Sequence, residues 1–272
     1  MKVAGRIVVL LFLCSIIFDF WGKEQKKKED VIPPVISSDR DELRVDIRNG
    51  AFELREGLQA IDNVDGDITS EIIVGTISPF KEKGVCDVEY IVFDSNNNVG
   101  RYERTVYFEH YEAPKLKLLK PLAYEANGRV VISDRLVAED MLEGDISGKM
   151  RFSSSNLSAY EVGTYELNVE VKNSYGDIVK YQLPINIVPF KYNKEYIQLE
   201  DYLVYTKVGE NLKPKDYIKS VVGRNDEKVS LEQIDITVDV DFSIPGVGQI
   251  CYELYEGRDV IYATYLIVIV EE

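Results

Sequence analysis

The sequence contains few of the residues that most enzymes use for chemistry. It has a single histidine, His110, three cysteines and one tryptophan in 272 residues. Nucleophile–histidine catalysis needs the histidine inside a pocket, oriented by a third group. A lone histidine near an expected domain joint is more typical of an exposed linker. Neither the P-loop nor the dinucleotide-binding glycine pattern is present. We therefore expect a protein that is not an enzyme and that has no catalytic residues.

Cysteine is equally sparse. Cys14, Cys86 and Cys251 are widely separated, and no C-x-x-C pair occurs. This spacing gives no sign of a local disulfide framework, and one histidine with scattered cysteines cannot supply the four ligands of a zinc site. The body of the protein must be stabilised by its hydrophobic cores.

Positive charge is also in short supply. The chain has 32 Lys and Arg against 47 Asp and Glu, a formal net charge of −15. Such a body repels phosphate backbones, so we expect no nucleic-acid partner. The same excess of acids makes chance carboxylate pairs unavoidable, and no pattern brings two of them into one cleft. A glycosidase-like acid pair is therefore unsupported.

The apolar run at residues 7–18 is too short to span a bilayer, which takes about 20 residues. Lys2 and Arg6 precede it, as in a secretory signal. We expect a signal peptide or an uncleaved signal anchor at residues 1–22, attaching the protein to the membrane, and a charged tether at 23–34. Lysines in the tether favour a cytoplasmic body under the positive-inside rule. The repeats described next favour export, either anchored and facing outside or secreted after cleavage.

Beyond the tether the chain repeats itself. The pattern A-x-D-x-x-D-G-D-I at residues 60–68 recurs at 138–146 with Glu143 in place of one Asp, and a glycine-led strand follows each copy. Asp67 and Asp145 are 78 positions apart, and Gly84 and Gly163 are 79 apart. A degenerate third copy begins its strand near Gly248. The spacing predicts three domains, at residues 35–110, 111–189 and 190–272.

Within each copy, apolar and polar residues alternate over short segments that end in turn residues. In the first copy Cys86, Val88, Tyr90 and Val92 share one face. In the second copy the apolar face holds Tyr165, Leu167, Val169 and Val171. A period of two with one buried face is typical of strands in an antiparallel sandwich. The predicted class is all-β, with three tandem β-sandwich domains after an N-terminal hydrophobic helix.

The string A-x-D-N-V-D-G-D-I-T at residues 60–69, with Gly84 and Arg104-Thr105-Val106, resembles a bacterial immunoglobulin-like surface repeat family. That family occurs in tandem on exported Gram-positive proteins and beside the domains of some crystal toxins. The resemblance implies immunoglobulin-like domains, display at the cell surface and a role as spacer, adhesion or protein-interaction module, without a shared active site. A carbohydrate-binding accessory module is the alternative. We therefore expect a protein or a cell-wall carbohydrate as the partner, and the sequence does not identify which.

Asp62, Asp65, Asp67 and Asp94 are the best candidates for a specific role. Carboxylate oxygens clustered at a turn could hold Ca²⁺. The competing interpretation is turn chemistry, in which the aspartates cap backbone N–H groups, Gly66 takes a positive φ and Ile68 anchors the turn. We favour the turn interpretation and expect no cofactor, with Ca²⁺ as the alternative.

The last strand, at residues 260–270, is apolar on both faces. A sandwich strand normally has one polar face. Either a loop of its own domain covers the second face, or a neighbour or partner does.

Overall fold

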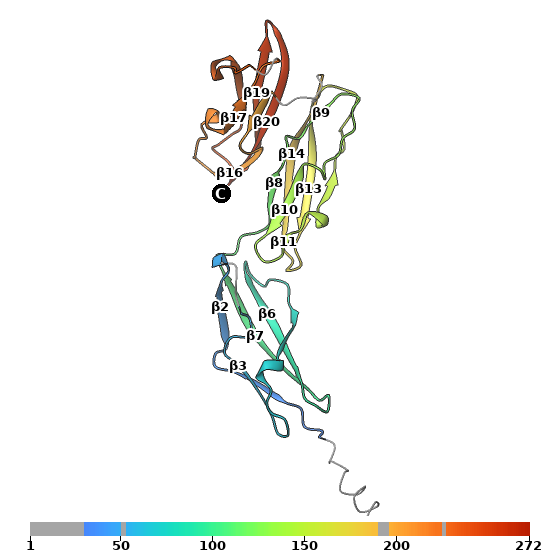
Figure 1. The fold of residues 1–272 in the computed structure, drawn as a ribbon, viewed down its shortest axis with the longest axis vertical. Helices are drawn as coiled ribbons and strands as arrows, with labels where there is room; N and C mark the ends of the chain where they lie inside the picture. The colour runs from blue at the N-terminus through green and yellow to red at the C-terminus, as the bar shows by residue number, and fades with distance from the viewer. Residues whose placement is uncertain (1–29, 50–52, 190–195, 225–226) are drawn as a thin grey trace, which may run out of the picture. The chain divides into compact units, whose positions relative to one another are not determined.

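The computed structural model describes residues 30–49, 53–189, 196–224 and 227–272. In these ranges every long element is a strand, and the helical elements are short 3-10 turns (Figure 1). The predicted all-β class is confirmed. The predicted leader at residues 1–22, with its hydrophobic helix, lies outside the described residues, as do residues 23–29 of the tether. Within the described ranges, no helix has the length and hydrophobicity that a membrane span requires.

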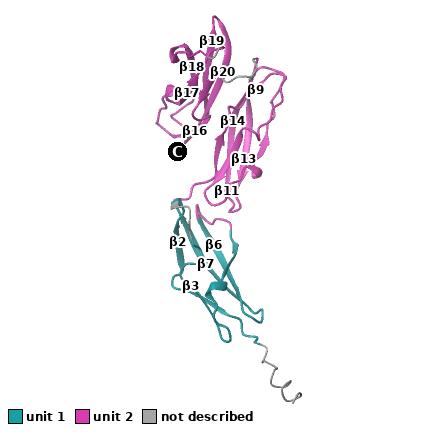
Figure 2. Cartoon of the chain, in the orientation of Figure 1, with its two compact units in different colours: residues 1–78, 85–109 teal, residues 79–84, 110–272 magenta. Residues whose placement is uncertain are grey.

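The chain separates into two compact units (Figure 2). Unit 1 contains residues 1–78 and 85–109, and unit 2 contains residues 79–84 and 110–272. Unit 1 thus holds most of the first repeat, and unit 2 holds the second and third. The predicted division of unit 2 at residues 189–190 lies beside the undescribed stretch 190–195 and remains a prediction.

Unit 1 is a sandwich of two sheets. Its strands are β1 Val35–Ser38, β2 Glu42–Asp46, β3 Leu58–Asp62, β4 Gly66–Asp67, β5 Ile73–Ile77, β6 Val85–Phe93 and β7 Val99–Glu109, with 3-10 turns η1 Ile47–Asn49 and η2 Thr69–Glu71. The sheet orders are β1-β3-β4 and β2-β7-β6-β5. Strand β1 runs antiparallel to β3, whereas β2 runs parallel to β7 in the other sheet. The start of the repeat therefore contributes to both layers.

The alternating pattern of β6 builds the core of unit 1. The side chains predicted to face inward are fully buried, namely Cys86, Val88, Tyr90 and Val92. Residues between them remain partly exposed. Burying such apolar side chains stabilises the fold by about 1.5–3 kcal/mol each.

Arg104, from the motif that carries the family resemblance, is buried in this core. Its guanidinium donates to the carbonyl oxygen of Leu54 at 2.6 Å and to the hydroxyl of Tyr90 at 3.2 Å. The Tyr90 hydroxyl also donates to the Leu54 carbonyl, at 2.6 Å. Buried polar groups are stable when paired in this way, so the arginine has a structural role in tying a loop to the core.

The second repeat, in unit 2, has the same element order. Its strands are β8 Lys115–Leu118, β9 Ala123–Glu125, β10 Leu136–Asp140, β11 Gly144–Asp145, β12 Arg151–Ser153, β13 Gly163–Lys172 and β14 Ile178–Val188, with the 3-10 turn η3 Ser147–Lys149. The sheet orders are β11-β10-β8 and β12-β13-β14-β9. Leu167, Val169 and Val171 of β13 are buried as predicted, while Tyr165 is partly exposed.

The third repeat also forms two sheets, although it lacks the D-G-D motif. Its elements are β15 Ile197–Leu199, β16 Leu203–Lys207, η4 Pro214–Tyr217, β17 Ile218–Val221, η5 Leu231–Gln233, β18 Ile234–Asp239, β19 Gly246–Glu256 and β20 Asp259–Glu271. The sheet orders are β15-β17 and β16-β20-β19-β18. The predicted glycine-led strand and the apolar last strand correspond to β19 and β20.

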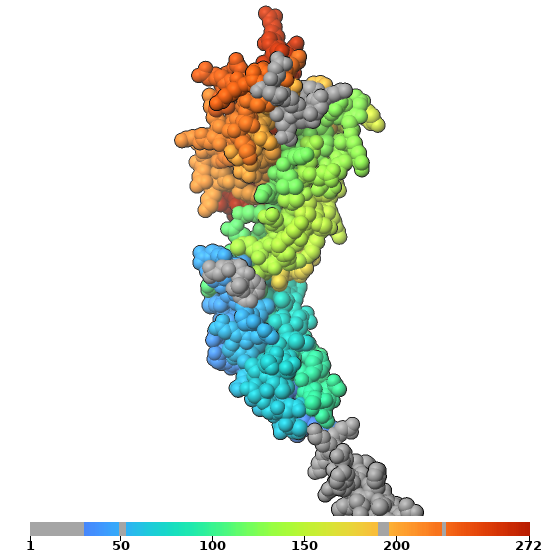
Figure 3. Space-filling view, viewed as in Figure 1, coloured from blue at the N-terminus to red at the C-terminus, as the bar shows by residue number. Residues whose placement is uncertain are grey.

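The second and third repeats share one hydrophobic core, which includes Leu116 and Ile187 together with Leu266 and Ile269. Strand β19 contacts β14, and β16 contacts β8. In the space-filling view, the third repeat (orange) packs directly against the second (green and yellow) (Figure 3). This explains why β20 is apolar on both faces: the second repeat covers the face turned away from the third repeat's own sandwich.

Polar contacts accompany this shared core. The amide nitrogen of Asn186 on β14 donates to the side-chain oxygen of Gln249 on β19 at 2.9 Å. The backbone N–H of Leu116 donates to the hydroxyl of Tyr205 at 2.7 Å. Buried apolar residues and paired polar groups both contribute to this contact, so the two repeats form one compact unit.

Candidate functional site

The D-G-D turn of the first repeat joins β3 to β4 and is held by the side chain of Asp62. Its Oδ1 atom accepts hydrogen bonds from the backbone N–H groups of Asp65 and Val64, both at 2.8 Å. These bonds lower the pKa of Asp62, because they stabilise the charged carboxylate. Gly66 has a φ of +76°, which is the left-handed conformation that glycine adopts without strain. This much of the turn interpretation is confirmed.

Asp65 and Asp67 also serve the turn. The carboxylate of Asp65 accepts from the backbone N–H of Ser95 at 2.7 Å and from its hydroxyl at 2.9 Å, which joins the turn to the end of β6. Asp67 accepts from the N–H of Thr69 at 3.0 Å and from its hydroxyl at 2.6 Å. These bonds lower the pKa of Asp67. Neither residue joins the cluster described next.

Three aspartates meet at this end of the sandwich: Asp30, Asp62 and Asp94. One carboxylate oxygen from each lies within 4.8 Å of the others. Asp94 follows β6, and its Oδ1 atom accepts from the backbone N–H groups of Asn96 at 2.9 Å and Asn98 at 2.7 Å. Asp30 comes from the segment before β1. Its backbone carbonyl accepts from the side-chain amide of Asn98 at 2.9 Å, which places it beside the other two.

The cluster concentrates acidic groups away from water. Asp62 is only 4% exposed and Asp94 6% exposed. Among the described residues, the Oδ2 atoms of Asp30 and Asp62 are buried and have no hydrogen-bond partner. No ion pair between described residues involves any of the three carboxyl groups. Burying unpaired acidic oxygens costs stability, so this arrangement calls for a compensating positive group.

The equivalent position in the second repeat is built differently. Asp140 takes the place of Asp62, and its Oδ1 atom accepts from the backbone N–H groups of Leu142 and Glu143 at 2.9 and 3.0 Å. Its Oδ2 atom accepts from the side-chain amide of Asn173 at 3.0 Å and from the hydroxyl of Tyr111 at 3.2 Å. Asn173 also donates to the Tyr111 hydroxyl at 2.7 Å.

This second cluster contains one buried carboxylate, Asp140, and two neutral donors, with the partly exposed carboxylate of Asp177 beside Tyr111. Asp140, Asn173 and Tyr111 are at least nine-tenths buried, and burial raises the pKa of Tyr111, which keeps its hydroxyl protonated. The Asp140 carboxylate thus receives hydrogen bonds from four donors within unit 2.

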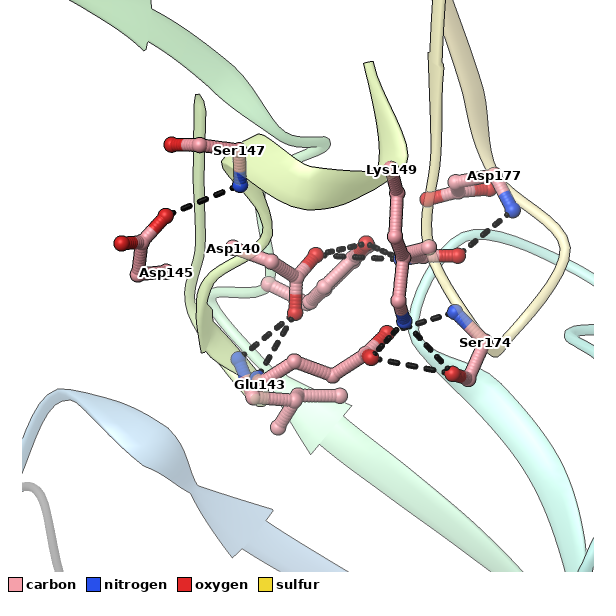
Figure 4. Close-up of polar contacts among 10 residues, drawn as sticks. Asp140, Glu143, Asp145, Ser147, Lys149, Ser174 and Asp177 are labelled. Atoms are coloured by element: carbon pink, nitrogen blue, oxygen red, sulfur yellow. Dashed lines mark hydrogen bonds and ion pairs between the residues drawn. The ribbon is translucent and has the colours of Figure 1, made fainter. Parts of the chain in front are cut away.

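Other bonds around the two turns correspond closely. Glu143 accepts from the backbone N–H of Ser174 at 2.5 Å and from its hydroxyl at 2.9 Å, as Asp65 does with Ser95 (Figure 4). Lys149 also pairs with Glu143. Asp145 accepts from the N–H of Ser147 at 2.8 Å, as Asp67 does with Thr69. The turns are therefore the same structure with different groups beside the buried aspartate.

Two of the three residues of the acidic cluster, Asp62 and Asp94, were candidates from the sequence, together with Asp65 and Asp67, which lie outside the cluster. Asp30 was not among the candidates, because it precedes the first strand and belongs to no repeated pattern. His110, the only histidine, is exposed.

No family model matches the chain. A curated protein, the pesticidal crystal protein Cry22Aa of Bacillus thuringiensis, is 27% identical over 195 residues, which are 65% of this chain and 25% of that protein. The chain therefore spans about a quarter of the length of the relative it matches. The identity is too low, and the share of that protein too small, to assign a family.

Several solved structures are distantly similar to the chain. The CBM51-2 domain in complex with GlcNAc and the INT domains of Clostridium perfringens ZmpB are 16% identical, with a TM-score of 0.24, covering 54% of this chain and 26% of that chain. The lipoprotein BT2262 of Bacteroides thetaiotaomicron is 13% identical, with a TM-score of 0.21, covering 86% and 98%. The extracellular cadherin domains 1–5 of protocadherin gamma B2 are 10% identical, with a TM-score of 0.19, covering 88% and 60%. At such scores these similarities carry no argument.

Proposed function

We propose that this chain is a non-enzymatic surface protein whose immunoglobulin-like domains act as a spacer or interaction module outside the cytoplasmic membrane. The observation that carries the proposal is the common core of the second and third repeats. A body of two sandwiches joined by buried apolar residues holds its outer surfaces in a fixed relation, which suits display or spacing.

Two sequence features support export and surface display. The basic and apolar start resembles a signal sequence, and the D-G-D-containing repeats resemble a bacterial immunoglobulin-like surface family. The similarity to Cry22Aa is in line with that resemblance, since the family also occurs beside crystal toxin domains. Membrane attachment would then depend on residues 1–22.

Cell fractionation with protease shaving tests this proposal. The chain is expressed in a Gram-positive host, and intact cells are treated with protease before lysis. We expect the protein in the membrane or medium fraction, with the membrane-bound form digested on intact cells. Protection of the body until the cells are lysed would contradict export. A cytoplasmic marker protein, which must stay intact, controls for leakage.

Carbohydrate binding is the second candidate function, because the outer face of β12, β13 and β14 forms a hollow lined by polar side chains. Asn168 and Gln182 are cross-strand partners on that face, and both line the hollow. Amide groups donate and accept the hydrogen bonds that sugar hydroxyls require. Affinity electrophoresis against cell-wall polysaccharides, with Asn168→Ala as the comparison, tests it: equal migration of the two proteins in every polysaccharide would remove this candidate.

A further inference from the structure

We propose that Asp30, Asp62 and Asp94 form a calcium site that fastens the segment before β1 to the first sandwich. The distances between the groups fit this assignment. Calcium–oxygen bonds are about 2.3–2.6 Å long, so two ligands of one ion are at most about 5 Å apart. One oxygen from each of the three carboxyl groups meets this limit, at 4.8 Å or less.

The unpartnered Oδ2 atom of Asp62 is an observation separate from the clustering. Asp62 is more than nine-tenths buried, and its Oδ1 atom is fixed by two backbone N–H groups. The turn thus orients the carboxylate, while among the described residues its other oxygen has no hydrogen-bond donor. Buried polar atoms in stable proteins nearly always have a partner, and a bound cation supplies one.

The ligand chemistry favours calcium over other common ions. All the groups at the cluster are oxygen donors, whereas zinc sites use nitrogen and sulfur as well. Magnesium requires near-ideal octahedral geometry and releases its water reluctantly. Calcium accepts six to eight oxygens in flexible geometry, so three carboxyl groups can be completed by water. Asp94 Oδ2 accepts one bond from Asn98, at 2.7 Å, and keeps lone pairs for a metal.

Asp30 gives this site a structural consequence. It lies at the end of the predicted tether, and the segment after it runs close to β7. A Cβ atom at Gly100 would overlap the carbonyl oxygen of Pro34, so glycine is needed for this close approach. Calcium bound to Asp30 would fix the point at which the tether leaves the sandwich. This inference goes beyond the proposed function and does not depend on it.

Calcium titration of the full chain tests the site. The protein is stripped with EDTA and titrated with CaCl₂ or MgCl₂ by calorimetry, and its melting temperature is measured in parallel. We expect one calcium ion per chain with a Kd of about 10⁻⁴–10⁻³ M, the range of extracellular calcium modules. We also expect the melting temperature of unit 1 to rise by several degrees, because a ligand that binds only the folded state stabilises it.

Two matched variants remove one charge each from the same region. Asp94→Asn should abolish calcium binding and the calcium-dependent rise in melting temperature, and leave the melting temperature in EDTA equal or higher. Asp67→Asn should leave the Kd unchanged, because Asp67 lies in the same turn but faces Thr69. Asp62→Asn provides a second test of the ligand set, with folding again checked in EDTA.

Hydrogen exchange at residues 30–35 tests the docking step. Calcium should slow exchange there in the wild-type chain and not in Asp94→Asn. The proposal is overturned if 10 mM CaCl₂ produces neither heat nor a melting shift, if MgCl₂ acts equally well, or if Asp67→Asn loses binding while Asp94→Asn keeps it. Calcium binding without slower exchange at residues 30–35 would overturn the docking step. None of these outcomes affects the protease-shaving test of surface display.

Discussion

In the first repeat, buried Asp62 faces two further carboxyl groups, from Asp30 and Asp94. In the second repeat, buried Asp140 faces an amide and a phenol, from Asn173 and Tyr111. The turn that carries each aspartate is otherwise the same, with two backbone N–H bonds to one oxygen and a glycine of positive φ. The two repeats therefore differ in what occupies the second oxygen.

This difference shows how one scaffold can be closed or left open to a ligand. The second repeat satisfies its buried carboxylate with its own donors. The first repeat has acids in place of both donors, which leaves the Oδ2 atoms of Asp30 and Asp62 without partners among the described residues. An acid in place of an amide costs stability in a buried position unless a cation is bound. The first repeat is therefore the one in which binding can be coupled to stability.

Replacing Asn173 with aspartate should have the largest effect, since it places a second acid beside Asp140, as Asp94 stands beside Asp62 in the first repeat. The new carboxyl would lie beside Asp140 in a site where Asn173 is 2% exposed. We expect unit 2 to lose about 3–5 kcal/mol of stability at pH 7, the usual cost of an uncompensated buried charge. Urea unfolding of the full chain, with the unit assigned by hydrogen exchange, measures the loss.

The pH dependence of that variant checks the cause. The second carboxyl binds its proton more tightly in the folded chain than in the unfolded chain, where its pKa is about 3.9. The penalty is therefore present in full at pH 7 and shrinks as pH falls toward 4. Calcium should not rescue the variant, because Tyr111 still occupies the third position. A penalty that is the same at pH 7 and pH 5 would exclude charge repulsion.

Tyr111→Phe should have a smaller effect, because it removes a neutral hydroxyl and leaves the charge unchanged. Asp140 and Asn173 each lose one partner inside the core. We expect a loss of about 1–3 kcal/mol, the cost of leaving buried polar groups without a bond. Tyr107→Phe is the control, because the hydroxyl of Tyr107 meets Glu42 at the surface, and its removal should change stability by less than about 0.5 kcal/mol. Equal effects of the two variants would show that the Tyr111 hydroxyl does not stabilise the second cluster.

The comparison also shows which parts of the molecule could be predicted from sequence. Period-two alternation identified the buried face of β6, because one face of a sandwich strand is always apolar. Asp62 and Asp94 were found because they stand at strand ends beside turn residues. Asp65 and Asp67 are also aspartates beside turn residues. Only the structure shows that their carboxylates already accept hydrogen bonds from Ser95 and Thr69.

Asp30 and the partner of β20 needed the structure, whereas Asn173 did not. Asp30 lies in the tether, where no alternation gives it a place. Asn173 stands 79 residues after Asp94, the spacing already seen between Gly84 and Gly163, so this pair could have been matched from sequence. The partner of β20 could not, because its two apolar faces indicate burial without identifying what covers them. That cover depends on how two domains pack, and the pattern of one strand does not encode it.

Gly100→Ala should weaken calcium binding in the first repeat without changing the carboxyl groups of Asp30, Asp62 and Asp94. The added methyl group would displace Pro34 and with it Asp30. We expect calcium affinity to fall about tenfold, as is usual when a residue that positions a ligand is lost, while the melting temperature in EDTA changes much less. Calorimetry measures both affinities. An unchanged Kd would show that Asp30 can bind calcium without the close contact between Pro34 and Gly100. A large loss of stability in EDTA would show that the substitution disturbs the core at Val92.

The smallest effects are expected where the two repeats are the same. Gly66 has a φ of +76° and Gly144 a φ of +71°, and a Cβ atom at either position would meet nothing within 4 Å. Alanine at either position should therefore lower the stability by only about 1 kcal/mol, the cost of holding alanine in the left-handed conformation. Equal losses in units 1 and 2, measured by hydrogen exchange in EDTA, would confirm that the turns are equivalent. In calcium, Gly66→Ala should also lower the affinity of the first repeat, because the strained turn carries Asp62. A difference between the two variants that persists in EDTA would mean that the turns differ in more than the groups beside the buried aspartate.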